Sequence, residues 1–395
     1  MPTLDEKADK EMRRQWHMLQ LPSGAESRAI VGRVISRLQA ALKKQGRLSV
    51  DRVVPCGSWG RGTNIPGSDL DLVAFLNPSS ALVPPRDNLT ILGIMRAAFS
   101  DDVGCRFERV PRRGDHALIF YVDGVPVDLV LARNCVGRAA AREESSTAEL
   151  QAEGAMRMLL EDVDRCDMPL YMSSFSETAN AFVKAQPGWV NELIRIVKHR
   201  VFDSDVTVTT SAGLTLRMRD KRDRKRAGIT SYLIETLALW AALRLVPPPA
   251  ARSSGSVAAV LRAVLGRVCS PSSLKARLPP PLWPPVWQRL HERDAAFRAR
   301  VTEVSAQRPF VSDVACPLNN LCAGRGGRAV TAEGWDLLRA GLEAALSRSA
   351  AVAAAAGSAR TRGPSRSAAD ASTYSSWHAS SFNVEALRQA LPECH

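Results

Sequence analysis

The chain has 395 residues, of which 45% are hydrophobic and 24% charged, so it can bury a sizeable core and exceeds the usual size of one domain. A formal net charge of +13 favours an anionic partner, namely a nucleotide, a nucleic acid or an acidic membrane. No stretch approaches the roughly 20 apolar residues of a membrane span, and no apolar signal-peptide core is seen. Eight cysteines without a CxxC pair match no common zinc pattern. We expect a cytoplasmic protein with reduced thiols and no membrane association.

The first half of the chain predicts one long helix and then several strands. Residues 26–44 place apolar side chains at helical spacing with basic residues opposite, which predicts an amphipathic helix with a basic face. Strand signals dominate from Val53 to Leu131. They include the hairpin "ALIFYVDGVPVDLVLA", in which Asp123 and Gly124 supply the turn between two β-rich runs.

After about residue 138 the pattern becomes helical, and proline-rich breaks such as "VPPPA" divide it. The predicted helices cover residues 148–163, 175–185, 189–201, 230–245, 257–268, 283–304 and 331–347. The segment 348–395 lacks the large aliphatic residues that form a core, so it predicts a disordered tail whose alanine run can be transiently helical. We therefore expect an α+β domain over 1–165, a helical domain over 166–347 and this tail.

The stretch "CGSWGRGTNIPGSDLDLVAFL" (56–76) sets two aspartates one residue apart in an apolar run. In a strand, Asp69 and Asp71 project from the same face while the leucines between and after them pack on the other. Adjacent carboxylates repel unless a cation lies between them, and a pair of Mg²⁺ ions is the usual solution. Asp128, in the apolar run "VPVDLVLA", is a candidate third carboxylate from a neighbouring strand.

A glycine-rich turn precedes these aspartates and suits phosphate binding. Gly57 and Ser58, followed by flexible residues 60–63, can bring backbone N–H groups and hydroxyls close to a triphosphate. Taken alone, alternating aspartates are commonly a solvated sheet face and a Gly-Ser pair is commonly only a turn. Their combination with a later strand aspartate favours catalysis.

The order of these motifs resembles that of the polymerase-β-like nucleotidyltransferases, and its form is similar to that of the 2′-5′-oligoadenylate synthetases. "ELIRIVKHR" (192–200), "SYLIETLALWA" (231–241) and "RPFVSDVACPLNNL" (308–321) resemble the helical-domain signatures of that family in the same order. The resemblance covers roughly residues 27–347. It implies a nucleotidyltransferase domain with a mixed or antiparallel sheet, an all-helical domain and a central active-site cleft between the two lobes.

The resemblance also implies a reaction. Two Mg²⁺ ions bound by Asp69, Asp71 and Asp128 hold the ATP triphosphate, and a ribose hydroxyl attacks the α-phosphorus with release of pyrophosphate. Asp128 is the candidate that helps to activate this hydroxyl. In the family the attacking group is the 2′-OH of an adenosine acceptor, and the product is 2′-5′-linked oligoadenylate. Nothing in the aspartate triad itself selects 2′ over 3′.

Two positions in the helical half match nucleotide contacts of the family. Arg195 and Lys198 lie on one face of a helix and match residues that hold substrate phosphates, whereas an unrelated Arg-x-x-Lys is usually a solvated basic face. Ser231 and Tyr232 begin an apolar helix, where the hydroxyl reaches phosphate and the ring stacks on the donor adenine, unless Tyr232 is ordinary core packing. Ser231 replaces an amide common in the oligoadenylate branch and matches the related cyclic-dinucleotide synthases.

Vertebrate family members are activated by double-stranded RNA on a basic groove, through phosphate and 2′-OH contacts. The candidate contacts in this chain are Arg28, Arg33, Arg37, Lys43, Lys44, Arg47 and Lys184. Two expected basic residues are missing, because Pro55 and Asn180 stand at their positions. The run "RMRDKRDRKR" (217–226) is either a replacement for them or a solvated loop.

Three function classes follow. The first is a monomeric enzyme that makes 2′-5′-oligoadenylate from ATP in innate antiviral defence, with double-stranded RNA as its activating partner. The second is a nucleotidyltransferase with another product, such as a cyclic dinucleotide or a 3′-tailed RNA, and possible independence from RNA. The third is a catalytically inactive RNA-binding relative, which the intact aspartates Asp69, Asp71 and Asp128 disfavour.

Overall fold

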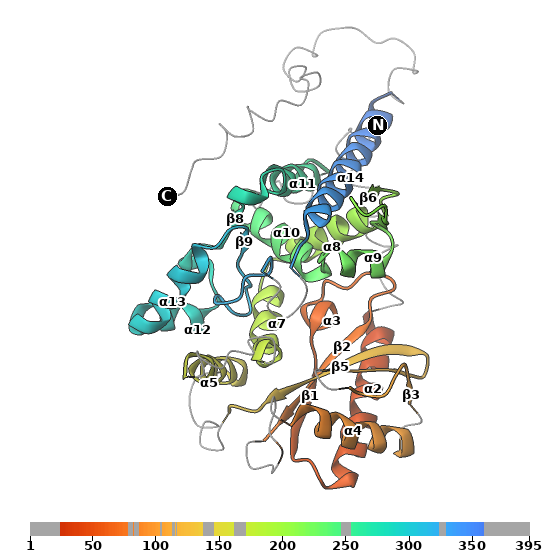
Figure 1. Ribbon diagram of the computed structural model, residues 1–395, viewed down its shortest axis with the longest axis vertical. Helices are drawn as coiled ribbons and strands as arrows, with labels where there is room; N and C mark the ends of the chain where they lie inside the picture. Colours follow the sequence, from red (N-terminus) through yellow and green to blue (C-terminus); the bar gives the residue numbers. More distant parts are fainter. Residues whose placement is uncertain are drawn as a thin grey trace.

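The computed structural model describes residues 24–77, 82, 87–102, 105–112, 115, 117–136, 146–161, 171–245, 254–323 and 329–358. These residues form a lower lobe built on a β-sheet and an upper lobe built mainly of helices (Figure 1). The predicted α+β class is confirmed, whereas the second half, predicted to be all-helical, also contains four short strands among the residues that the structure describes.

The sheet of the lower lobe has five strands in the order β1-β2-β5-β4-β3. The strands are β1 (Val50–Pro55), β2 (Leu70–Leu76), β3 (Arg106–Phe107), β4 (Ala117–Val122) and β5 (Val125–Arg133). The central pair β2 and β5 is parallel and all other pairs are antiparallel, so the sheet is mixed. Asp123 and Gly124 join β4 to β5 with φ angles of 51° and 79°, the left-handed geometry that a tight hairpin turn requires. The predicted hairpin is confirmed.

Two helices, α2 (Gly24–Gln45) and α4 (Asn88–Asp102), pack on one face of this sheet. The period of two sends alternate β2 residues to opposite faces. Leu70, Leu72, Ala74 and Leu76 point into the core under these two helices. Val73 and Phe75 lie on the other face in a smaller cluster. That other face is the one that turns toward the upper lobe.

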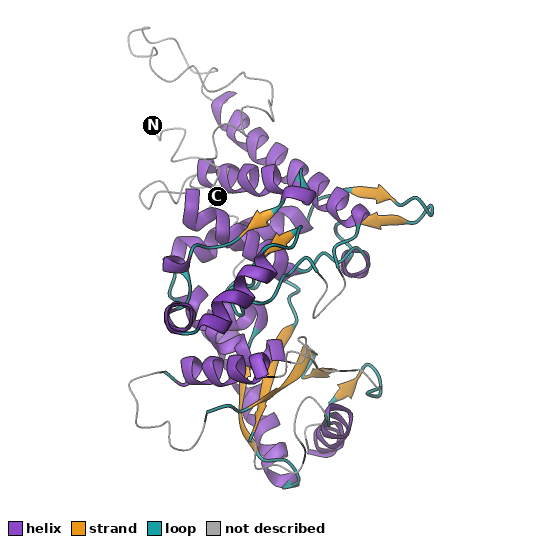
Figure 2. Cartoon of the chain, turned by 60° about the vertical axis from the view of Figure 1, so that its left-hand side comes forward, coloured by secondary structure: helices purple, strands orange, loops and turns teal. Residues whose placement is uncertain are grey.

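The upper lobe has one large hydrophobic core. Its longer helices are α5 (Thr147–Glu161), α7 (Ser176–Lys184), α8 (Gly188–Phe202), α9 (Lys221–Arg226), α10 (Ser231–Leu245), α11 (Ser254–Val268), α12 (Pro285–Arg293), α13 (Ala295–Ser305) and α14 (Ala332–Ser358). Its short elements are η3 (Ser173–Phe175), η5 (Pro271–Ser273), η6 (Pro280–Leu282), β6 (Thr207–Thr209), β7 (Thr215–Arg217), β8 (Lys275–Ala276) and β9 (Phe310–Val311). The hairpin of β6 and β7 projects from this lobe, at the upper right of Figure 2.

The helix predicted over 283–304 is wrong as a single element. It divides into α12 and α13 at Asp294, whose side chain accepts a hydrogen bond from the backbone N–H of Phe297 and caps the second helix. In contrast, α14 continues past the predicted end at residue 347 to Ser358, because its alanine-rich sequence favours helix. The rest of the predicted tail, 359–395, lies outside the described residues.

Helix α5 belongs to the segment 1–165, yet its buried residues pack into the core of the upper lobe. The predicted boundary near residue 165 stays a prediction, since residues 162–170 are not described. The cysteines at 56, 105, 135, 269, 316 and 322 are free thiols. Among the helices that the structure describes, none is both long enough and apolar enough to cross a membrane.

Candidate active site

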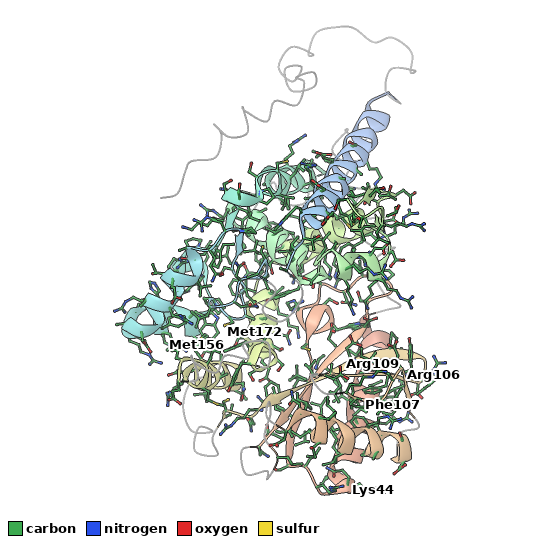
Figure 3. The ribbon with its side chains drawn as sticks, viewed as in Figure 1. Lys44, Arg106, Phe107, Arg109, Met156 and Met172 are labelled. Atoms are coloured by element: carbon green, nitrogen blue, oxygen red, sulfur yellow. The ribbon has the colours of Figure 1, made fainter. Side chains whose placement is uncertain are left out.

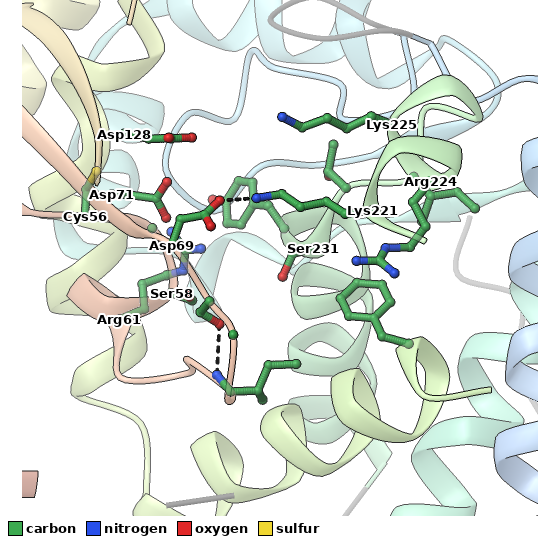
Figure 4. Close-up of a pocket in the computed structure, with 18 of the residues that line it drawn as sticks. Cys56, Ser58, Arg61, Asp69, Asp71, Asp128, Lys221, Arg224, Lys225 and Ser231 are labelled. Carbon is green, nitrogen blue, oxygen red and sulfur yellow. Dashed lines mark hydrogen bonds and ion pairs between the residues drawn. The ribbon is translucent and has the colours of Figure 1, made fainter. Parts of the chain in front are cut away.

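The three predicted aspartates line one cavity of about 880 Å³, formed by residues of both lobes (Figure 4). Asp71 on β2 and Asp128 on β5 are register partners on adjacent parallel strands. Both therefore project from the same face, away from the core under α2 and α4. Asp69 directly precedes β2 and completes the group, so it extends from the end of the strand and not from within it.

The glycine-rich turn is built against Asp71. Gly57 has φ +54°, and a Cβ atom there would lie 1.9 Å from Oδ2 of Asp71. The N–H of Cys56 donates to the Asp71 carbonyl at 2.8 Å, so backbone and carboxylate are fixed together. The predicted loop is in fact one helical turn, α3 (Gly57–Arg61), and both Gly57 and Ser58 line the cavity. Glycine is thus required at position 57 by the close approach of the carboxylate.

The carboxylates raise each other's affinity for protons. Burial raises the pKa of Asp71 to about 6, and the nearby Asp128 carboxylate adds to the effect. Burial, followed by repulsion from Asp69, also raises the pKa of Asp128. The cluster therefore concentrates negative charge that a cation relieves.

Asp69 is turned across the cavity, where its carboxylate contacts the ammonium group of Lys221 on α9 (Figure 4). Within the described part of the chain, no three His, Cys, Asp or Glu side chains are already arranged around a metal position. The donor set nevertheless fits a hard divalent cation in its chemistry. It consists of carboxylate oxygens from neighbouring positions, and a positive group already contacts one of them.

A buried ion network lies behind the cavity and joins the lobes. Glu235 on α10 accepts hydrogen bonds from Arg61 Nε at 2.5 Å, from the Thr63 hydroxyl at 2.6 Å and from Lys198 Nζ at 3.2 Å. Burial alone raises the pKa of Glu235, but Arg61 and Lys198 outweigh it and lower this pKa to about 2. The carboxylate is therefore ionised and holds α3 against α10.

Arg195 and Lys198 share one face of α8, as predicted. Both side chains form hydrogen bonds with the loop that follows α3. The Arg195 Nε donates to the Gly62 carbonyl at 2.9 Å, and Lys198 Nζ donates to the Thr63 carbonyl at 2.9 Å. Lys198 is fully buried, and neither residue is among the described residues that line the cavity. In this structure both residues position the loop, and their phosphate contacts stay a prediction.

Ser231 and Tyr232 do line the cavity, at the start of α10. The Tyr232 hydroxyl donates to the buried carboxylate of Asp313, and the Arg61 guanidinium lies 4.4 Å from the centre of its ring. One face of the ring is thus covered by a cation that also lines the cavity.

The residues predicted to contact RNA lie away from the cavity. Arg33, Arg37, Lys43, Lys44 and Arg47 are exposed on and just after α2, Lys184 is exposed at the end of α7, and the Arg28 side chain is not described. Lys44 lies at the lower end of the molecule in Figure 3. Asn180 donates to the Pro55 carbonyl at 2.8 Å, so the two positions that lack the expected basic residues contact each other.

The basic run 217–226 lies at the cavity instead. It forms the end of β7, a turn and α9, and its residues Arg219, Lys221, Arg224 and Lys225 line the cavity wall. Sequence reasoning missed this placement and also missed Arg61, Glu235 and Asp313. The available signals were the arginine within G-R-G-T and a glutamate in an otherwise apolar helix.

Comparison with known proteins agrees with this geometry. Residues 35–132 match the family model described as a nucleotidyltransferase domain, which includes all three aspartates. A search of curated proteins finds no significant match.

Solved structures extend the likeness to the upper lobe. CdnC of Escherichia coli MS115-1, in a complex with HORMA-deltaN, is 16% identical, with a TM-score of 0.50 over 89% of this chain and 91% of that one. CdnC with ATP gives 16% identity and 0.48 over 89% and 92%. The polymerase core of the RNA surveillance complex TRAMP gives 12% and 0.43 over 88% of each chain. The first likeness concerns the fold, and residues 35–132 contain the match to a nucleotidyltransferase domain.

Proposed function

We propose that this protein is a template-independent nucleotidyltransferase that joins AMP units from ATP into 2′-5′-linked oligoadenylate and releases pyrophosphate. The observation that carries the proposal is the register of Asp71 with Asp128 at a cavity between the lobes, inside the nucleotidyltransferase domain. The linkage and the nucleotide rest on the sequence resemblance to the oligoadenylate synthetases.

Asp69, Asp71 and Asp128 would hold two Mg²⁺ ions, which when bound supply charge neutralisation at the triphosphate and lower the pKa of the attacking hydroxyl. Asp128 accepts the proton of that hydroxyl on a carboxylate oxygen. Its pKa is raised, first by burial and then by the Asp69 carboxylate, and a higher pKa favours proton uptake. Gly57 fixes the orientation of the Asp71 carboxylate by its close approach.

Residues of both lobes orient the donor nucleotide. Ser58 on α3 and Ser231 on α10 line the cavity from opposite lobes and offer hydroxyl groups to phosphate oxygens. Tyr232, which lines the cavity, stacks its ring on the adenine. The buried hydrogen bond between Arg61 and Glu235 holds the two lobes in a fixed relative position during the reaction.

Double-stranded RNA is the proposed activator, with the exposed basic residues of α2 and Lys184 as its contacts. The contact of Asn180 with Pro55 places neutral groups where the family has basic ones. The alternative function is synthesis of a cyclic dinucleotide or another nucleotide product without RNA. It is favoured by Ser231, which matches the cyclic-dinucleotide synthases in place of the amide.

The test is incubation of the purified protein with ATP and Mg²⁺, with and without long double-stranded RNA. Products are resolved by chromatography before and after digestion with a 3′-5′-specific nuclease. Nuclease-resistant oligoadenylate that forms only with RNA supports the whole proposal. If the same product forms without RNA, the reaction is supported and the role of RNA as activator is rejected. A nuclease-sensitive product, or a product only from nucleotide mixtures, supports the alternative.

A further inference from the structure

Helix α9 is held firmly beside the cavity. The Asp220 side chain caps it by accepting from the N–H groups of Arg222 at 2.7 Å and Asp223 at 3.2 Å. Arg224 donates to a backbone carbonyl of the preceding turn and lies 4.1 Å from the centre of the Phe202 ring on α8. The helix therefore presents a defined face to the cavity.

That face carries two lysines, Lys221 and Lys225, one helical turn apart and both among the cavity-lining residues. Lys221 contacts Asp69, and Lys225 points in the same direction in Figure 4. The Lys225 carbonyl accepts from the Gly228 N–H at 3.3 Å, but its ammonium group forms no hydrogen bond or ion pair with any residue that the structure describes. Both ammonium groups thus lie opposite the aspartate cluster, on the other lobe.

The other cations near the cavity pair with protein groups outside the aspartate cluster. Arg61 is bound to Glu235, and Arg219 pairs with Asp203 at 3.1 Å and with Asp205 at 2.8 Å. Lys198, which matches a phosphate-binding position of the family, is buried against Glu235 and is not at the cavity wall. The positive charge available to an incoming polyphosphate therefore comes from α9.

We propose that Lys221 and Lys225 bind the β- and γ-phosphates of the donor nucleotide, in place of Lys198. The proposal rests on the proposed function for the existence of that donor. Lys221 contacts Asp69 in this structure. If Asp69 held a divalent cation, that cation would balance the charge of the carboxylate, and the Lys221 ammonium group would be available to pair with phosphate. The negative charge of the triphosphate is thus balanced by both lobes.

The experiment measures the equilibrium binding of two ligands. One is an ATP analogue with a methylene group between the α- and β-phosphates, which cannot release pyrophosphate, and the other is AMP. Both are measured with Mg²⁺ for the wild type and for Lys221→Ala, Lys225→Ala and Lys221→Arg. Arg222→Ala is the matched control, because Arg222 is exposed on the same helix and is not among the described residues that line the cavity. We expect each alanine variant to bind the analogue about 10-fold more weakly, with AMP binding unchanged and Lys221→Arg close to wild type.

Three results overturn the inference. They are unchanged affinity of both alanine variants for the analogue, equal losses for the analogue and AMP, and failure of the wild type to bind the analogue at all. The proposed function is tested separately, because no turnover occurs in this assay. If the analogue binds in a lysine-dependent way but ATP yields no pyrophosphate, the phosphate site is supported and the proposed transferase activity is rejected.

Discussion

Asp71 and Asp128 are direct register partners on the parallel strands β2 and β5, so two carboxylates from distant segments project side by side into one cavity. Burial and mutual repulsion raise the pKa of Asp71 to about 6. A protein that keeps such a pair carries an electrostatic cost unless a cation is bound there. This relationship is the basis of the proposed metal-dependent chemistry.

Replacement of Asp71 by asparagine removes one charge and keeps the shape. We expect Asp71→Asn to lower nucleotidyl transfer by at least about 100-fold, because the transition-state charge loses its preorganised partner. Addition of Mg²⁺ should raise the Tm of the wild type and not of this variant. Asp101→Asn, on the exposed surface of α4, is the control and should retain both properties. Full activity of Asp71→Asn would show that the Asp71 carboxylate is not needed for nucleotidyl transfer.

Gly57→Ala tests whether the turn positions the Asp71 carboxylate. The new methyl group would lie 1.9 Å from Asp71 Oδ2, so the carboxylate has to move, and the φ of +54° adds strain. Gly62→Ala is the matched control, because Gly62 has φ +76° and a Cβ atom added there would meet no atom within 4 Å. Measured kcat should fall by about 10- to 100-fold in Gly57→Ala and much less in Gly62→Ala. Equal effects would mean that backbone strain alone is responsible.

Glu235→Gln should destabilise the protein, because it leaves Arg61 and Lys198 buried without a countercharge. The expected loss at pH 7 is about 3 to 5 kcal/mol in the free energy of unfolding. The pKa of Glu235 is lowered from 4.5 to about 2, so its stabilisation is complete above pH 4.5 and is lost as the pH falls toward 2.

Denaturant unfolding at several pH values checks this prediction. The difference between wild type and Glu235→Gln should be largest above pH 4.5 and should shrink as the pH approaches 2. Glu303→Gln, at a side chain that is 63% exposed, is the control and should change stability little. A constant difference across this range contradicts the ionised network.

Tyr232 has two separable functions, a hydroxyl that donates to Asp313 and a ring that lines the cavity. Tyr232→Phe should cost about 1 to 3 kcal/mol of stability, because the buried Asp313 loses a donor, while the KM for ATP stays near that of the wild type. Tyr232→Leu removes the aromatic face as well and should raise this KM several-fold. Equal KM values in steady-state kinetics of the two variants would show that the ring does not stack on the base.

The sequence predicted the parts of the site that depend on local pattern. The period of two predicted which face of its own strand each of Asp71 and Asp128 occupies, and the Asp123-Gly124 turn predicted the hairpin of β4 and β5. The parallel pairing of β2 with β5, which brings the two aspartates together, is a long-range contact. The helix break at Asp294 depends on a side-chain cap. The helical periodicity of residues 283–304 continues across this position, so it did not indicate the break.

Long-range contacts could not be predicted in the same way. The contact between Arg61 and Glu235 joins residues 174 positions apart, and each looks like an ordinary charged residue in its own segment. For the same reason the motif around Lys198 indicated a phosphate contact, whereas Glu235 and the Thr63 carbonyl hold its ammonium group. The sequence of the run 217–226 indicated its positive charge. It did not indicate its place at the cavity, which depends on how the two lobes pack against each other.

Release of pyrophosphate from ATP in the presence of Mg²⁺ is the decisive measurement for the role of the paired aspartates. It is made for the wild type, Asp71→Asn and Asp101→Asn, with and without double-stranded RNA. We predict pyrophosphate from the wild type and Asp101→Asn, accompanied by a nucleotide product, and a loss of at least about 100-fold in Asp71→Asn. Pyrophosphate formation at the same rate in Asp71→Asn, or none from the wild type with any nucleoside triphosphate, would contradict the proposed chemistry.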